Sequence, residues 1–217
     1  MRTAQIIRKT RETDINLSLN IDGGDYCVDT NCGFLNHMLE LFAVHSGFGF
    51  VLSCKGDVEV DFHHTVEDVG IAMGQAFLQA MGDKKGIARY ADITLPMDEA
   101  LILCAVDISG RGTLNYAVEI PAAKVSDESD EIKQRQVGIF DTELIEEFFI
   151  AFAREAKVTL HIVKMFGKNT HHIIEGIFKA FAHTFILAID TASIALAPSF
   201  FLLSVLSSLL IILSIIA

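Results

Sequence analysis

Residues 61–70 read DFHHTVEDVG, and residues 170–178 read THHIIEGIF. Both stretches contain the pattern His-His-x-x-Glu, and together they use four of the eight histidines in the chain. If each copy opens a helix, the glutamate follows the first histidine by four positions and the second by three, so it lies on the same face as both. The two adjacent histidines diverge by about 100° around the helix axis. Each copy can therefore offer ligands to two different metal ions.

The sequence around the two copies is repeated as well. Residues 34–47 and 142–156 each predict an amphipathic helix, the first ending at Gly47. Apolar residues recur at i, i+3, i+4, i+7 and i+8 in both, 110 positions apart: Leu35, Met38, Leu39, Phe42 and Ala43, then Ile145, Phe148, Phe149, Phe152 and Ala153. His171 follows His63 by 108 positions, which is nearly the same interval. We interpret the chain as an internal duplication.

Strand-like runs complete the two halves. The runs are 4–10 and 14–22 as an opening hairpin, 48–56, 58–62 leading into the first histidine pair, 100–110 and 114–120 as paired strands, and 157–164. This order predicts an α+β fold (an α/β sandwich) of two half-domains, each a mixed β-sheet with helices packed on one face. The predicted boundaries are residues 1–84 and 85–190 for the half-repeats and 191–217 for an apolar tail.

Composition limits the partners and the compartment. The net charge of −11 disfavours nucleic acid, whose phosphates recruit basic surfaces, but it leaves room for a small anionic ligand. The four cysteines show no CxxC spacing and no disulfide-rich density, and no signal peptide is recognisable at the N-terminus. We therefore expect a cytoplasmic protein.

The tail is unusual because no charged residue follows Asp190. Its apolar and serine-containing sequence is long enough to cross a bilayer, which takes about 20 residues. A membrane anchor, a buried terminal helix and an altered reading frame are the open alternatives. The lack of a positive flank weakens the anchor interpretation.

Imidazole with carboxylate suits Mn, Fe, Zn, Ni or Co, and the lack of cysteine ligands argues against a structural zinc finger. A single His-His pair is more often a solvated helix start, but two copies at matched positions favour a metal site. His37 lies off the apolar stripe of its helix, and the 110-residue offset places Glu147 at the matching position. His161 is expected to be structural, and His183 to complement a helix dipole.

Five blocks closely resemble the imidazoleglycerol-phosphate dehydratase family. They are FLNHMLELFAVHSGF (34–48), DFHHTVEDVGIAMGQA (61–76), GIARYADITLPMDEAL (86–101), VDISGRG (106–112) and TLHIVKMFGKNTHHIIEGIFKAFA (159–182). The resemblance implies a hydro-lyase that converts imidazole glycerol phosphate to imidazole acetol phosphate in histidine biosynthesis. It also implies two Mn²⁺ ions per site, and trimers that assemble into a 24-subunit shell with the sites at subunit contacts.

By motif, the resemblance assigns the metal ligands as His37, His63, His64, Glu67, Glu147, His171, His172 and Glu175. The implied substrate and phosphate contacts are Glu12, His45, Arg89, Arg111, Lys179 and Ser199. We expect the cation to favour the deprotonated imidazole ring, which then expels the hydroxyl group through a diazafulvene-like intermediate. Glu12 or Glu175 is the expected base for the neighbouring carbon.

Two departures from the family pattern bear on activity. Asn36 stands where relatives carry aspartate before the histidine, which removes one carboxylate near His37. The tail lacks the usual lysine after Pro198-Ser199, so phosphate affinity is expected to fall. The alternative function is therefore a catalytically impaired metal-binding homologue, tethered to a membrane by its tail. A generic dinuclear hydrolase is disfavoured because no nucleophile motif is present.

Overall fold

The opening hairpin forms as predicted, with β1 (Thr3–Lys9) antiparallel to β2 (Thr13–Asn20). The structure is a computed structural model that describes residues 1–121 and 136–190. Alternate side chains of β2 are buried, because successive residues of a strand point to opposite faces of the sheet. β4 (Gly49–Gly56) pairs antiparallel with β2, and β3 (Tyr26–Asp29) pairs parallel with β4. The first sheet has the order β1-β2-β4-β3.

The second sheet repeats this arrangement. Its order is β5-β6-β10-β7, with bounds Tyr90–Met97, Ala100–Asp107, Thr159–Phe166 and Thr113–Ala117. β10 is antiparallel to β6 and parallel to β7, just as β4 is antiparallel to β2 and parallel to β3. Two short strands, β8 (Gln136–Val137) and β9 (Phe140–Asp141), pair separately. The predicted fold class and its two mixed sheets are confirmed.

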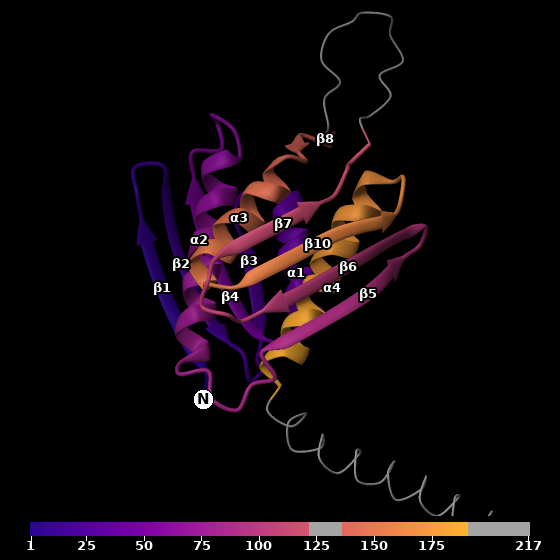
Figure 1. Ribbon diagram of the computed structural model, residues 1–217. Helices are drawn as coiled ribbons and strands as arrows, with labels where there is room; N and C mark the ends of the chain where they lie inside the picture. Colours follow the sequence, from indigo (N-terminus) through magenta and orange to yellow (C-terminus); the bar gives the residue numbers. More distant parts are fainter. Residues whose placement is uncertain (122–135, 191–217) are drawn as a thin grey trace, which may run out of the picture.

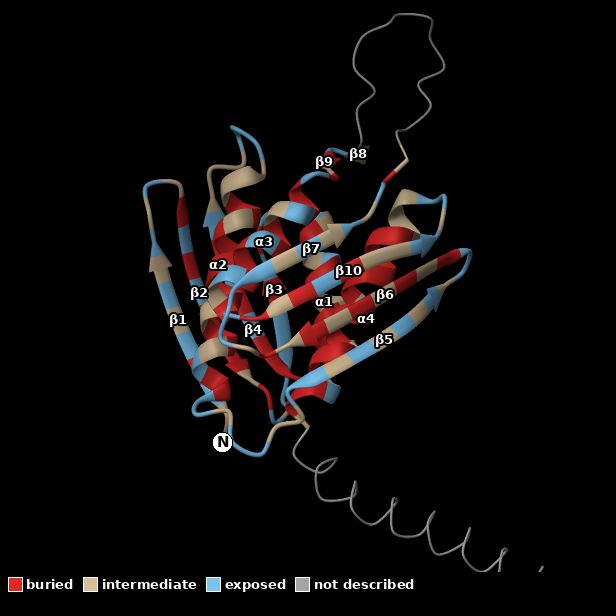
Figure 2. Cartoon of the chain, viewed as in Figure 1, coloured by how far each residue is buried: buried red, intermediate tan, exposed pale blue. Residues whose placement is uncertain are grey.

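In the described part of the chain, four helices lie between the two sheets (Figure 1). They are α1 (Gly33–Ser46), α2 (His63–Met81), α3 (Leu144–Ala156) and α4 (Thr170–Ile189). α2 packs on β1 and β2, and α4 packs on β5 and β6; α2 also packs on α3, and α1 on α4. Along β2 and β6, buried residues alternate with less buried ones (Figure 2). Helices therefore cover one face of each sheet, as predicted.

The core between the sheets is built from phenylalanine rings. Phe42, Phe77, Phe152, Phe181 and Phe185 are fully buried and contact one another at centroid distances from 4.8 to 6.1 Å. Burying one such side chain contributes about 1.5–3 kcal/mol. All ten apolar positions predicted from the helix repeats are buried. The apolar stripes thus direct α1 and α3 into one shared core.

Two glycines allow α2 to approach α3 closely. A Cβ atom at Gly70 would lie 2.6 Å from the carbonyl oxygen of Phe148, and one at Gly74 would lie 2.6 Å from that of Phe152. No side chain fits at these distances, so the helix backbones meet directly. The α2/α3 contact is therefore fixed by residues four positions apart on one helix.

Two strand predictions are wrong. Residues 58–62 do not form a strand: residues 58–60 form a turn, closed by a bond from the Val60 N–H to the Asp57 oxygen, and residues 61–62 lead from it into α2. The runs 100–110 and 114–120 are strands, but β10 lies between them, so they do not pair with each other. Because β6 and β7 follow each other in the sequence, they were expected to be neighbours in the sheet. The chain instead crosses from β7 through α3 to β10, and β10 lies between them. The half-repeat boundary at 84/85 stays a prediction, and the predicted tail 191–217 lies outside the described residues.

Among the described residues, α4 is the one helix long and apolar enough to cross a membrane. Two thirds of its apolar window (67%) is buried inside the fold, however, and a buried core helix passes the same test. α4 packs on α1, β5 and β6. Its composition therefore reflects its place in the core.

Candidate metal centre

Three predicted ligands meet where α1 and α4 pack together. His37 of α1 and His171 and Glu175 of α4 each offer one ligand atom, and these atoms lie within 4.8 Å of one another. His171 Nε2 is 3.3 Å from Glu175 Oε2, and the rings of His37 and His171 are 5.7 Å apart. Glu175 is nearly buried, whereas His37 is exposed. The centre therefore opens to solvent on its histidine side.

The start of α4 is held in place by local hydrogen bonds. The Asn169 side chain accepts from the backbone N–H groups of His171 and His172, which are otherwise unpaired at a helix N-terminus. Glu99 in the β5–β6 turn accepts from the N–H groups of Lys168 and Asn169. The second histidine pair is thus attached to β5–β6 as well as to its own helix.

Glu175 is ionised by its surroundings. Burial alone would raise the pKa of Glu175, but the bond from Lys179 Nζ, at 2.6 Å, and the charges of Lys179, His171 and His37 bring it below its ordinary value. An ionised carboxylate beside two imidazoles is a donor set that suits a divalent transition metal. These residues fit the predicted cation.

The second histidine of each pair points elsewhere, as the helical spacing predicts. His172 Nδ1 lies 2.7 Å from Glu99 Oε2, and His64 Nδ1 lies 3.0 Å from Asp57 Oδ2. These bonds raise the pKa of both histidines, and the bond from His172 lowers the pKa of Glu99 to about 2. Because a carboxylate only accepts, each Nδ1 donates, which leaves Nε2 as the ligand atom of each ring; in His172 that atom lies 3.6 Å from Asp98 Oδ2.

The first copy of the motif is less complete within the chain. His63 Nε2 lies 3.9 Å from Glu67 Oε2, and Glu67 faces Arg154 at 4.0 Å. Over residues 1–121 and 136–190, the His37 centre is the one group of three candidate ligands, so Glu147 does not join His63 and Glu67. Phe34, Phe140 and Phe62 stand in ring contact between His171 and the start of α2. One cation therefore cannot contact both copies in the same chain, since ligand bonds are about 2 Å long.

The two predicted arginine contacts lie together but far from this centre. Arg89 Nε bonds to Asp107 Oδ1 at 2.8 Å, and Arg111 Nη2 lies 3.8 Å from Asp107 Oδ2. The backbone N–H of Arg89 donates to the oxygen of Ala188 at the far end of α4. Ala188 follows Glu175 by thirteen positions of helix, which is about 20 Å at 1.5 Å per residue. The arginines therefore cannot reach a small substrate at the His37 centre of their own chain.

The other predicted contacts lie in different places. Lys179 joins the centre through its ion pair with Glu175. The charges of Lys179 and Glu175 both act on the pKa of His45. Glu12 is half-buried beside the Asp57 turn, and its charge reaches His64. Ser199 lies outside the described residues. The side chain of Asn36 accepts from the N–H and hydroxyl of Thr30, so the expected looser orientation of His37 stays a prediction.

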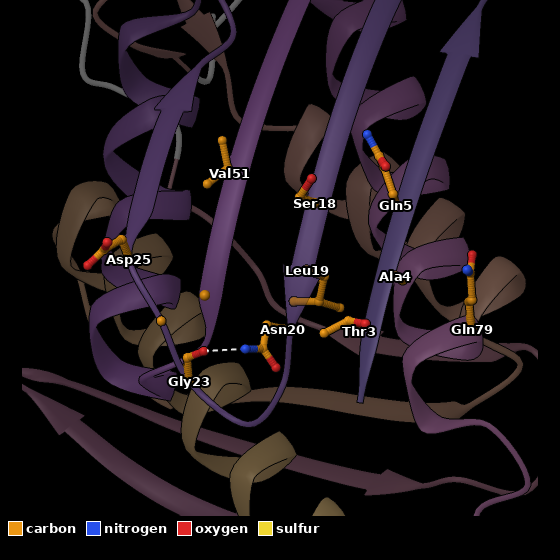
Figure 3. A pocket seen from close by; sticks show the side chains of 12 residues that line it. Thr3, Ala4, Gln5, Ser18, Leu19, Asn20, Gly23, Asp25, Val51 and Gln79 are labelled. Carbon is orange, nitrogen blue, oxygen red and sulfur yellow. Dashed lines mark hydrogen bonds between the residues drawn. The ribbon is translucent and has the colours of Figure 1, made fainter. Parts of the chain in front are cut away.

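A hollow of about 540 Å³ lies elsewhere, between β1, β2 and the turn before β3 (Figure 3). Gln5, Ser18 and Val51 line it, and Asn20 closes one end by donating to the Gly23 oxygen at 2.6 Å. None of the predicted site residues that the structure describes lines this hollow. The candidate site is therefore identified by its cluster of ligand-type side chains and not by the volume of a cavity.

Comparison with known proteins decides the family. The family model described as imidazoleglycerol-phosphate dehydratase matches residues 30–185. The chain belongs to the imidazoleglycerol-phosphate dehydratase family. An imidazoleglycerol-phosphate dehydratase from Methylorubrum extorquens is 49% identical over 202 residues, covering 92% of this chain and 97% of the relative. One from Oceanobacillus iheyensis is 53% identical over 182 residues, covering 83% and 88%.

Solved structures of imidazoleglycerol-phosphate dehydratases share this fold. The enzyme from Staphylococcus aureus superposes with a TM-score of 0.74 at 40% identity, covering 86% of this chain and 98% of that one. The enzyme from Pyrococcus furiosus, solved in complex with (S)-C348, gives 0.71 at 32% identity, covering 85% and 93%. The predicted family and the hydro-lyase class are confirmed, and the impaired-homologue alternative is not favoured.

Sequence reasoning missed the partners of the second histidines. Asp57 and Glu99 hold His64 and His172, and neither was predicted as a site residue. The internal repeat could have predicted Glu99 as a site residue. Glu12 precedes β2 directly and Glu99 precedes β6 directly, so the two acids occupy matching places in the two halves.

Proposed function

We propose that this chain dehydrates imidazole glycerol phosphate to imidazole acetol phosphate, a metal-dependent step of histidine biosynthesis. Membership of the dehydratase family supports the reaction. The main observation for the site is that His37 of α1 meets His171 and Glu175 of α4, which follow it by 134 and 138 positions in the chain. We further propose that the enzyme works in the cytoplasm.

We propose that Mn²⁺ occupies this centre, with two ions per complete site. His37, His171 and Glu175 would hold one ion, and His64 and His172, whose Nδ1 atoms are bound by carboxylates, would offer Nε2 to ions at other centres. His63, Glu67 and Glu147 are the proposed ligands of the first copy. When bound to the substrate ring, the cation supplies charge that stabilises the deprotonated imidazole and so favours loss of the hydroxyl group.

Glu12 is the proposed base that removes the proton from the neighbouring carbon. Glu175 is engaged by His171 at 3.3 Å and Lys179 at 2.6 Å, and its lowered pKa makes it a weak base. Glu12 is half-buried near His64, so its carboxylate stands beside a second proposed ligand. Base help of this kind contributes roughly 10²–10⁴-fold.

The separation of the arginines from the His37 centre supports a site shared between chains. Arg89 and Arg111 flank Asp107, and they would hold the substrate phosphate through charge-assisted bonds at the centre of a neighbouring chain. Lys179, His45 and Ser199 are the remaining proposed substrate contacts. Self-association to trimers and a 24-subunit shell is the proposed form, because it would bring these groups together.

The function is tested by an assay of the full chain with imidazole glycerol phosphate. Turnover is expected with Mn²⁺, is expected to stop after chelation, and is expected to return on adding Mn²⁺. A variant with a lysine-bearing polar tail serves as the matched comparison for phosphate affinity. Full activity after complete metal removal would contradict the proposed metal dependence. If neither the chain nor its polar-tail variant turned over substrate, the impaired-homologue interpretation would be favoured instead. Particle size measured with and without Mn²⁺ tests the proposed assembly.

A further inference from the structure

A line of polar side chains continues along the α1/α4 contact beyond the metal centre. On α4, His171, Glu175, Lys179 and His183 follow one another at intervals of four residues. On α1, His45 follows His37 by eight residues, which is about two turns along the same face. Residues at these spacings lie on one side of a helix. The line therefore connects the ligands to His45 and His183.

His45 and His183 contact each other across the two helices. His45 Nδ1 lies 3.2 Å from His183 Nε2, and the rings are 5.3 Å apart at an angle of 68°. Both side chains are half-buried. His183 was expected to complement the dipole of α4, but its ring is engaged by α1 instead. This contact leaves Nε2 of His45 without a hydrogen-bond partner among the described residues.

The surroundings keep His45 neutral. Burial, followed by the positive charge of Lys179 and by His183, lowers the pKa of His45, and Glu175 opposes this only in part. A neutral imidazole carries one donor and one acceptor nitrogen, and the bond at one nitrogen selects the role of the other. The partner of Nδ1 therefore determines what Nε2 can do.

We propose that His183 is a positioning residue, which binds Nδ1 of His45 and so orients Nε2 of His45 toward the substrate. This inference rests on the proposed function, in which His45 contacts the substrate. His183 itself stands one turn beyond Lys179 and acts through the ring of His45. Loss of His183 frees the His45 ring to rotate, which weakens substrate binding and leaves the metal centre intact.

The α2/α3 contact offers a matched control pair. The offsets of 108 and 110 residues place Gln75 opposite His183 and Glu155 opposite His45. Gln75 Nε2 donates to Glu155 Oε2 at 3.1 Å across α2 and α3, the same arrangement as the histidine pair. Gln75 takes no part in the proposed site. Removing the Gln75 side chain breaks one hydrogen bond between two helices, as removing His183 does, but it does not affect a proposed substrate contact.

The test compares His183→Leu, His183→Gln and Gln75→Leu in the full chain with Mn²⁺ and imidazole glycerol phosphate. His183→Leu is expected to raise KM about tenfold while kcat stays within about twofold, since one hydrogen bond that orients a substrate contact is lost. His183→Gln keeps an amide that can donate to Nδ1 or accept from it, so KM should stay within about threefold of the unchanged chain. Gln75→Leu should leave both constants unchanged.

Each outcome decides between the alternatives. Equal KM values for His183→Leu and Gln75→Leu would overturn the inference, as would a loss in His183→Gln as large as in His183→Leu. If His183→Leu fails to assemble, His183→Asn replaces it, because its shorter side chain remains polar but does not reach Nδ1. Absence of turnover by the unchanged chain would overturn the proposed function and this inference with it.

Discussion

The α2/α3 contact and the α1/α4 contact are equivalent in the duplicated fold, since each joins one helix of the first half to one helix of the second, but they are built differently. Gly70 and Gly74 bring α2 against the backbone of α3. The matching positions of α4, 108 residues later, are Phe178 and Ala182. α4 instead faces α1 with a line of ionisable side chains from His171 to His183. The α2/α3 pair is therefore held by close backbone packing, whereas the α1/α4 pair contains the centre that joins ligands from two helices.

This difference explains why a repeated motif has unequal surroundings. Both copies begin a helix with His-His-x-x-Glu, but only the second finds a third candidate ligand within the described part of its own chain. In the first copy, Glu67 is approached by Arg154. A repeated motif therefore specifies the ligands, while the neighbouring helix decides whether a centre is complete.

The largest expected effect comes from the α1/α4 centre. His171→Ala removes a ligand and should lower activity by more than about 100-fold, since losing even a supporting partner costs 10–100-fold. Bound Mn²⁺ per chain should fall as well. His161→Ala is the matched control, because His161 is exposed on β10 and its ring bonds to Asn115 at 3.4 Å, away from the centre. Equal losses in both variants would break the comparison.

Glu99→Gln should lower the affinity for Mn²⁺ by about 10–100-fold, because Glu99 fixes the Nδ1 proton of His172. Titration of the metal-free protein with Mn²⁺ measures this. Asp83→Asn is the control, since Asp83 pairs with Lys85 on the surface. An unchanged affinity in Glu99→Gln would show that His172 needs no such support.

Gly74→Ala tests the packed contact and should destabilise the fold by about 1–3 kcal/mol, because the added Cβ meets the Phe152 oxygen at 2.6 Å. Gly33→Ala, where nothing lies within 4 Å, should cost no stability. Denaturant unfolding of the metal-free protein measures both. Ligand geometry is untouched, so metal affinity should not change; a stable Gly74→Ala would contradict the close approach.

The smallest expected effect concerns pH. Glu99 raises the pKa of His172, and Asp57 raises that of His64, above the ordinary value of about 6.5. Their contribution to the stability of the metal-free protein is therefore fully present below that value and is lost as pH rises through the raised pKa. Melting temperatures of the metal-free protein should fall slightly between about pH 6 and 8. Glu99→Gln should reduce this slope, and an unchanged slope would count against the pair.

Periodicity predicted α1, α3 and their buried faces, because a 3.6-residue repeat is visible in residues such as Leu35 and Phe148 without tertiary information. Pairing of strands was predicted less well. β10 lies between β6 and β7 because a crossover connects β7 to β10. Local sequence does not indicate which strand lies between two others. The turn at 58–60 was misread because its valines alternate like a strand while Val60 is exposed.

The sequence by itself determined the duplicated order of elements, the buried faces of the helices and the identity of the ligand-type residues, because these depend on local spacing and chemistry. Only the tertiary structure decided which ligands meet: His37 with His171 and Glu175, His172 with Glu99, and His45 with His183. Such pairs lie on different helices and turns. Their distances depend on how closely the elements pack, and that follows from the whole core rather than from any one segment.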